Sequence, residues 1–141
     1  MEFVIVTGLS GAGKSVAIDA MEDIGFYCLD NIPPKLILDF YDLCQQSKGG
    51  FERVAVVTDI RSGENFLTLF ESLERMKEEE KSYKILFLDA SHPVRMKRYK
   101  ETRRRHPLID DQIISLEDAI LKEEEMLKPV KEIADYIIDS T

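Results

Sequence analysis

The chain opens with Phe3-Val4-Ile5-Val6-Thr7-Gly8-Leu9-Ser10-Gly11-Ala12-Gly13-Lys14-Ser15, an apolar and β-branched run that leads into the pattern GxxxxGKS. This pattern predicts a phosphate-binding loop (P-loop) between a strand and a helix. Its glycines let successive backbone N–H groups surround a phosphate, and the N-terminus of the following helix adds its positive dipole. We therefore expect residues 8–15 to bind a nucleoside triphosphate.

Two side chains of this loop have expected roles of their own. Lys14 would contact the β- and γ-phosphates, and the Ser15 hydroxyl would be a ligand of Mg²⁺. The other loop residues would line the phosphates: Gly8, Leu9, Ser10, Gly11, Ala12 and Gly13. Apolar residues at helical spacing follow the loop and end at Gly25, so the context that the motif needs is present.

Composition limits the size and class of the protein. The chain has 141 residues, 44% of them hydrophobic, which suffices for one well-buried domain but not for two ordinary ones. It has no run of 18 apolar residues and no secretion signal, so we expect a cytoplasmic protein without a membrane partner. The net charge of -8 argues against nucleic-acid binding over a broad face. Cys28 and Cys44 are expected to be reduced core residues.

Strand-like segments alternate with helical patterns along the whole chain. We expect strands at 3–7, 25–29, 53–58, 84–88 and 135–138, and helices at about 14–24, 34–46, 63–80, 92–104 and 116–133. Such alternation predicts βαβ units. The expected fold is therefore α/β, with a five-stranded parallel sheet and helices on both faces.

Three carboxylates follow expected strands and are candidates to support a metal ion: Asp30, Asp59 and Asp89. Ligands of an open parallel sheet gather at the carboxyl ends of its strands, where P-loop proteins place a carboxylate near Mg²⁺. We expect only one of the three to follow a strand beside the P-loop strand. Asp59 is favoured and Asp89 is its competitor, whereas Asp30 lies where a phosphoryl acceptor could be held. Each could instead be a turn or capping carboxylate.

A cluster of seven cations occupies the eleven residues from Arg95 to Arg105. Three interpretations are open. Arg103, Arg104 and Arg105 could form a lid that neutralises charge on the triphosphate during transfer. The cluster could instead contact RNA phosphates, or it could be a solvated helix face. Its position in the chain favours the lid.

Four stretches together resemble the RapZ/YvcJ family of bacterial nucleotide-binding proteins, also called RNase adapter proteins. They are residues 4–15, Asp30-Asn31-Ile32-Pro33-Pro34, Asp59-Ile60-Arg61-Ser62 and Glu101-Thr102-Arg103-Arg104-Arg105-His106-Pro107-Leu108. The resemblance covers essentially the whole chain. It implies a P-loop fold similar to that of small-molecule kinases, with binding and slow hydrolysis of ATP and GTP.

The same resemblance implies where the nucleotides bind. Residues 8–15 would form the ATP site, and Asp59, Ile60, Arg61 and Ser62 match a segment assigned to GTP. A magnesium-supporting Asp59 explains that segment equally well. Family members look about twice as long, with a second domain that binds RNA and an amino-sugar phosphate in the characterised adapters. We therefore expect this chain to be the N-terminal domain of a longer protein. We do not expect this domain by itself to bind RNA.

These observations lead to one hypothesis and two alternatives. The hypothesis is a regulatory Mg²⁺-dependent NTPase, linked to small-RNA or amino-sugar regulation in the longer family members. Hydrolysis would be slow, since no evident water-positioning glutamine or dedicated base accompanies the loop. The first alternative is a small-molecule kinase that transfers the γ-phosphate to an acceptor near Asp30. The second is a binding module in which the nucleotide switches a contact made by the cation cluster.

Overall fold

The computed structural model describes residues 2–9, 12–46, 52–58, 63–91, 93–94, 96–97 and 116–139, with the backbone alone for residues 63–66 and 116. The strands are β1 (Glu2–Gly8), β2 (Tyr27–Leu29), β3 (Arg53–Val57), β4 (Lys84–Asp89) and β5 (Tyr136–Asp139). The helices are α1 (Lys14–Asp23), the short 3₁₀ helix η1 (Pro34–Leu36), α2 (Ile37–Gln46), α3 (Gly63–Glu78) and α5 (Leu116–Ile133). Most of the helix expected at 92–104 lies outside the described residues.

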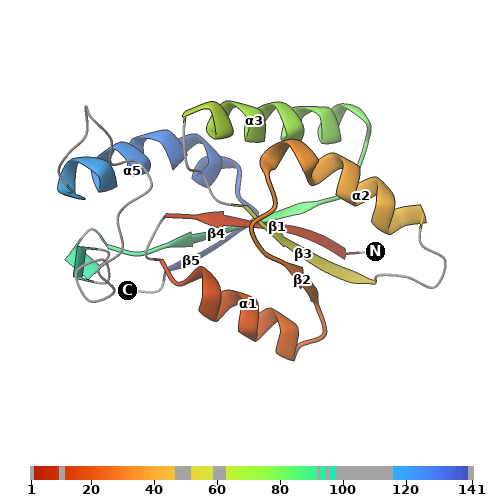
Figure 1. Cartoon of the computed structure of the whole chain (residues 1–141), viewed down its shortest axis with the longest axis horizontal. Coiled ribbons are helices and arrows are strands. Elements are labelled where there is room, and N and C mark those ends of the chain that lie inside the picture. Colours follow the sequence, from red (N-terminus) through yellow and green to blue (C-terminus); the bar gives the residue numbers. More distant parts are fainter. Residues whose placement is uncertain are drawn as a thin grey trace.

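The strands form one parallel sheet in the order β2-β3-β1-β4-β5 (Figure 1). The expected five-stranded parallel sheet is thus confirmed, and β3 is a neighbour of β1 as expected. The expectation that only one candidate carboxylate follows a strand beside the P-loop strand is wrong. Because β1 is the central strand, it pairs with β3 on one side and with β4 on the other, and these two strands lead to Asp59 and Asp89.

The described helices cover the two faces of the sheet unequally. α1 lies on one face, and α2, α3 and α5 lie on the other (Figure 1). The handedness of the connections explains this arrangement. The crossover from β1 to β2 runs in one direction along the sheet, whereas the later crossovers run in the opposite direction. Because all of these crossovers are right-handed, the helix of the first lies on one face and the helices of the later ones lie on the other.

Two helices end in the same backbone arrangement. After α1, Gly25 has a φ of 97°, and the N–H of Phe26 donates to the carbonyl of Met21 at 3.0 Å. After α3, Glu80 has a φ of 57°, and the N–H of Lys81 donates to the carbonyl of Met76 at 2.9 Å. This is the Schellman motif, for which glycine is the usual residue. Because a glutamate at position 80 does not indicate a helix end, the predicted end of this helix, residue 80, lies two residues after the observed end at Glu78.

The hydrophobic core lies between the sheet and the layer of α2, α3 and α5. α3 buries Leu69, Leu73 and Met76 in this core, and these residues recur at helical spacing. The hydroxyl of Ser72 donates to the carbonyl of Pro34 at 2.8 Å, which joins α3 to η1.

Two buried hydroxyl groups lie side by side at the carboxyl ends of β1 and β3. The register pairs Val6 of β1 with Val57 of β3, so Thr7 and Thr58 are neighbours whose side chains share a face of the sheet. Their exposed fractions are 1% and 0%, and neither Oγ1 atom has a hydrogen-bond partner among the described residues. A buried hydroxyl without a partner costs about 1–3 kcal/mol of stability.

We expect Thr58→Val to raise the free energy of unfolding by about 1 kcal/mol, because valine keeps the shape of threonine and removes the unsatisfied hydroxyl. Urea denaturation of both proteins measures the change. The control Thr58→Ser keeps the hydroxyl and deletes a buried methyl group, so it should lower stability by about 1 kcal/mol. A loss of stability in Thr58→Val would contradict the prediction, since it would show that the hydroxyl has a partner.

Candidate functional site

The P-loop begins where β1 passes very close to β4. The N–H of Leu9 donates to the carbonyl of Leu88 at 3.0 Å. A Cβ atom on Gly8 would collide with that carbonyl oxygen and would lie 2.8 Å from the nitrogen and 2.9 Å from the Cβ of Leu88. The first glycine of the motif is therefore required by the approach of a neighbouring strand.

The last glycine of the motif directs the chain into α1. Gly13 is the N-cap residue of α1, in the left-handed conformation with φ 87° and ψ 38°. It has no side chain to cap the helix, and the first N–H groups of α1 receive no N-cap side-chain bond. Lys14 and the exposed Ser15 form the first turn. This end of α1 presents N–H groups and a positive dipole, which suit an anion.

The rest of the loop is partly described. Leu9 and Ala12 are buried with exposed fractions of 5% and 1%, and the N–H of Ala12 donates to the carbonyl of Leu9 at 3.1 Å. These two apolar residues anchor the loop on the core. Several expected site residues lie outside the described residues: Ser10, Gly11, Asp59, Ile60, Arg61, Ser62, Arg103, Arg104 and Arg105.

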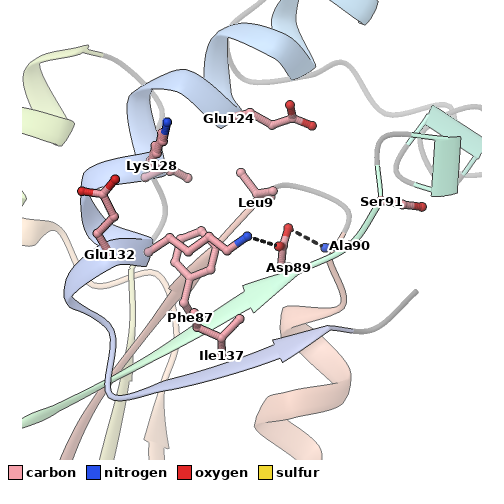
Figure 2. A pocket seen from close by; sticks show the side chains of 11 residues that line it. Leu9, Phe87, Asp89, Ala90, Ser91, Glu124, Lys128, Glu132 and Ile137 are labelled. Atoms are coloured by element: carbon pink, nitrogen blue, oxygen red, sulfur yellow. Dashed lines mark hydrogen bonds and ion pairs between the residues drawn. The ribbon is translucent and has the colours of Figure 1, made fainter.

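The carboxylate of Asp89, the competitor of Asp59, makes contacts within the protein. Its Oδ1 accepts a hydrogen bond from the N–H of Ala90 at 2.9 Å, and its Oδ2 forms an ion pair with Nζ of Lys131 at 2.6 Å (Figure 2). Lys131 comes from the last turn of α5, so the pair joins the end of β4 to α5. A carboxylate with both oxygens engaged in this way is a poorer ligand for a metal ion.

Sequence reasoning did not single out Lys131. Lysine in the last turn of a helix is common, because it complements the negative end of the helix dipole. Its partner Asp89 lies on a different element, 42 residues earlier. No local pattern therefore pointed to this ion pair.

A pocket of about 700 Å³ opens beside the ion pair, between α5 and the ends of β4 and β5 (Figure 2). Leu9 of the P-loop and Ile137 of β5 contribute apolar surface to it. Charged residues of both signs line its α5 side: Glu124, Lys128, Lys131 and Glu132. The mixture of signs gives the pocket no clear preference for a phosphate group.

The family of the chain follows from its sequence as a whole. Residues 1–141 match the family model described as the RapZ-like N-terminal domain. This chain belongs to that family. The resemblance found in the four sequence stretches is thus confirmed.

Curated relatives of this RapZ-like domain are longer proteins. A nucleotide-binding protein of Alkaliphilus oremlandii is 56% identical over 141 residues, a match that covers 100% of the chain and 48% of the relative. A nucleotide-binding protein of Clostridium botulinum strain Eklund 17B is 52% identical, again over 100% of the chain, and the match covers 47% of the relative. The RapZ-like domain therefore spans about half the length of the curated relatives it matches.

Solved kinases share the fold. The shikimate kinase of Bacteroides thetaiotaomicron superposes with a TM-score of 0.60 at 19% identity, over 99% of the RapZ-like domain and 86% of the kinase. The deoxyadenosine kinase of M. mycoides with bound dATP gives 0.53 at 14% identity, over 99% and 91%. At these identities the likeness concerns the fold alone. It confirms an α/β fold of the P-loop kinase type.

The third candidate carboxylate of the RapZ-like domain has a local structural role. Asp30 follows the edge strand β2 and is exposed, and its Oδ1 accepts a hydrogen bond from the N–H of Asn31 at 2.8 Å. Asn31 has a φ of 59°. Asp and Asn favour such turns, because their side chains bond the local backbone. This local contact is compatible with the interpretation of Asp30 as a turn carboxylate, and the exposed side chain does not decide between that interpretation and an acceptor site.

The two cysteines are packing residues, as expected. Cys44 is buried, and the half-buried Cys28 packs on α1, its Sγ lying 3.7 Å from the carbonyl oxygen of Ile18. Burial raises the pKa of both thiols, and the charge of Glu22 raises that of Cys28 further. Because the thiolate is the reactive form, both side chains are poor nucleophiles and poor metal ligands near neutral pH.

The described residues hold neither a cluster of metal-ligating side chains nor a helix that could span a membrane. In this part of the chain no three His, Cys, Asp or Glu side chains lie close enough together to hold a metal ion. None of the helices found there is long and apolar enough to cross a membrane.

Proposed function

We propose that this RapZ-like domain binds ATP or GTP with Mg²⁺ and hydrolyses the nucleotide slowly. The geometry of the P-loop carries the proposal. Gly8 lets the loop leave the sheet against β4, and the left-handed Gly13 leaves the first N–H groups of α1 without a side-chain cap. Two similar proteins of known sequence are called nucleotide-binding proteins, and the structurally similar deoxyadenosine kinase contains dATP, which supports the proposal.

The residues suit the Mg²⁺ complex of a nucleotide. Ser15 places an exposed hydroxyl on the first turn of α1, and Mg²⁺ prefers oxygen ligands and keeps several waters and phosphate oxygens. We propose that Ser15 and Asp59 hold the ion, which neutralises phosphate charge when it is bound. The engagement of Asp89 by Lys131 supports the choice of Asp59.

Other residues have proposed roles around the phosphates. Lys14 would contact the β- and γ-phosphates, and Arg103, Arg104 and Arg105 would form the lid over them. Ile60, Arg61 and Ser62 belong to the segment that the family resemblance assigns to GTP. Slow turnover follows from the sequence, because no evident glutamine positions a water molecule for attack.

We expect Lys14→Ala to weaken the binding of ATP and GTP by about tenfold to a hundredfold and to abolish turnover. The reason is that a hydrogen bond from a charged donor contributes about 1.5–3 kcal/mol. Calorimetric titration in the presence of Mg²⁺ measures the affinity, and phosphate release measures the turnover. Lys122→Ala, which removes an exposed lysine of α5, is the matched control and should behave as the unchanged protein. Equal affinities and rates for Lys14→Ala and the unchanged protein would refute the proposal.

We also infer that the domain is the N-terminal part of a longer cytoplasmic protein, in which the nucleotide regulates the remaining half. The lengths of the relatives support this, because the match covers 47–48% of them. RNA binding is assigned to the longer protein and not to this domain, whose net charge is -8. The kinase alternative gains no support from Asp30, because the hydrogen bond that its exposed carboxylate accepts comes from the N–H of the adjacent Asn31.

A further inference from the structure

The face of the sheet that carries α1 has an apolar groove. The groove has a volume of about 810 Å³ and runs between α1 and the strands β1, β4 and β5. Its apolar lining comes from α1 and its C-cap residue, from the residue before β2, and from β4 and β5: Met21, Ile24, Phe26, Leu86, Tyr136 and Ile138. The lining is one continuous surface, because the register pairs Leu86 of β4 with Tyr136 of β5.

Large apolar side chains in this groove are exposed to solvent. The exposed fractions are 62% for Ile24, 51% for Tyr136 and 47% for Ile138. None of the residues of α1 is buried, although their spacing predicts an amphipathic helix. Parallel sheets are ordinarily covered on both faces, and exposed apolar patches mark interaction surfaces. The groove therefore has the properties of an interface that lacks its other side.

None of the described helices covers the groove. α1 contacts β1, β2 and β3, while α2, α3 and α5 lie on the opposite face (Figure 1). Right-handed crossovers put α2, α3 and α5 there, because the connections from β2, β3 and β4 step in the same direction along the sheet. None of the helices described in these crossovers therefore covers β4 and β5 on the α1 face.

We infer that the first helix after β5, in the longer protein, packs into this groove. This inference rests on the proposal of a longer protein and not on nucleotide binding. The matched family is an N-terminal domain, and its relatives contain about as much chain again beyond the match. β5 is the edge strand beside the groove, and its end at Asp139 lies at the carboxyl edge of the sheet. A helix that follows it returns along β5 and β4, over the groove.

The chemistry of the groove specifies the helix. Ala17 and Ala20 are the small residues on the α1 side, so they leave space for large side chains of the incoming helix. Glu2 and Lys84 contribute charges to the same lining, and Nζ of Lys84 lies 3.2 Å from the hydroxyl of Tyr136. We therefore expect an amphipathic helix with a stripe of Leu, Ile or Phe flanked by polar residues.

Thiol labelling of the longer protein tests whether the groove is covered. Ala20→Cys places a thiol in the groove, and Asp19→Cys places one on the neighbouring exposed position of α1 as the matched control. Mass spectrometry follows the reaction of each cysteine with a maleimide, with the buried Cys44 as an internal reference. We expect Ala20→Cys to react about tenfold or more slowly than Asp19→Cys, because the thiol must wait for the helix to open. Equal rates would overturn the inference.

Cross-linking identifies the occupant. A benzophenone attached to Ala20→Cys is activated in a mixture of isotope-labelled and unlabelled protein, and the linked peptides are sequenced. The inference requires links to residues beyond 141 of the same chain. Links to the groove's own lining are expected in every case and decide nothing. Links between labelled and unlabelled chains, with none beyond residue 141 of the same chain, would show that a second copy covers the groove. Links to residues of 1–141 that do not line the groove would show that this chain covers itself. Either result would overturn the inference without affecting the test of nucleotide binding by Lys14→Ala.

Discussion

Gly8→Ala is expected to lower the free energy of unfolding by about 3 kcal/mol, the upper range for forcing an extra carbon into a packed site. The added Cβ would collide with the backbone carbonyl of Leu88, which is the acceptor for the N–H of Leu9. Neither strand can move aside easily, because β1 and β4 pair along five residue positions in the middle of the sheet. The P-loop would lose its anchor together with this hydrogen bond, so nucleotide binding should fall as well.

Urea denaturation followed by circular dichroism measures the effect of Gly8→Ala. The matched control is Gly25→Ala, which replaces a glycine with a φ of 97° where the nearest atom to a Cβ is the Arg53 guanidinium at 3.9 Å. Only the backbone conformation opposes that change, at a cost of about 1–2 kcal/mol. If Gly8→Ala were no more destabilising than Gly25→Ala, the close approach of β4 would not be what requires glycine.

The features of this fold that depend on residues close together in the sequence could be predicted. The apolar run before Gly8 marks a strand, and the spacing after Lys14 marks a helix, because each pattern repeats with the period of its own structure. The glycines of the P-loop were predicted from the motif. The physical reason for Gly8 was not visible, because the strand that crowds it is β4, far along the chain.

The features that the sequence did not predict depend on which strands become neighbours. The central position of β1 makes both Asp59 and Asp89 follow strands beside the P-loop strand, and no local pattern fixes the order of strands. The partnership of Asp89 with Lys131 likewise exists only after α5 has packed on β4. The exposed groove beside α1 could not be predicted from the sequence for a similar reason. Periodicity shows that a helix has an apolar stripe but not what covers it.

The two carboxylates beside the P-loop strand should therefore respond differently to substitution. We expect Asp59→Asn to remove the increase in nucleotide affinity that Mg²⁺ causes, a loss of about tenfold to a hundredfold, as for other groups that support a bound metal. Asp89→Asn should keep this Mg²⁺ dependence. It should lower the free energy of unfolding by about 1 kcal/mol, because it removes the negative partner of Lys131, whose side chain is 43% exposed and partly screened by water.

Titrations of ATP with and without Mg²⁺, together with urea denaturation, separate the two effects in each variant. Lys131→Met serves as the matched control, because it breaks the same ion pair and leaves both carboxylates unchanged. It should reproduce the stability loss of Asp89→Asn and keep the Mg²⁺ dependence. If Asp89→Asn abolished the Mg²⁺ dependence while Asp59→Asn retained it, the metal-supporting carboxylate would be the one at the end of β4. Lys131 would then compete with the metal ion for Asp89, and Lys131→Met should strengthen nucleotide binding in the presence of Mg²⁺.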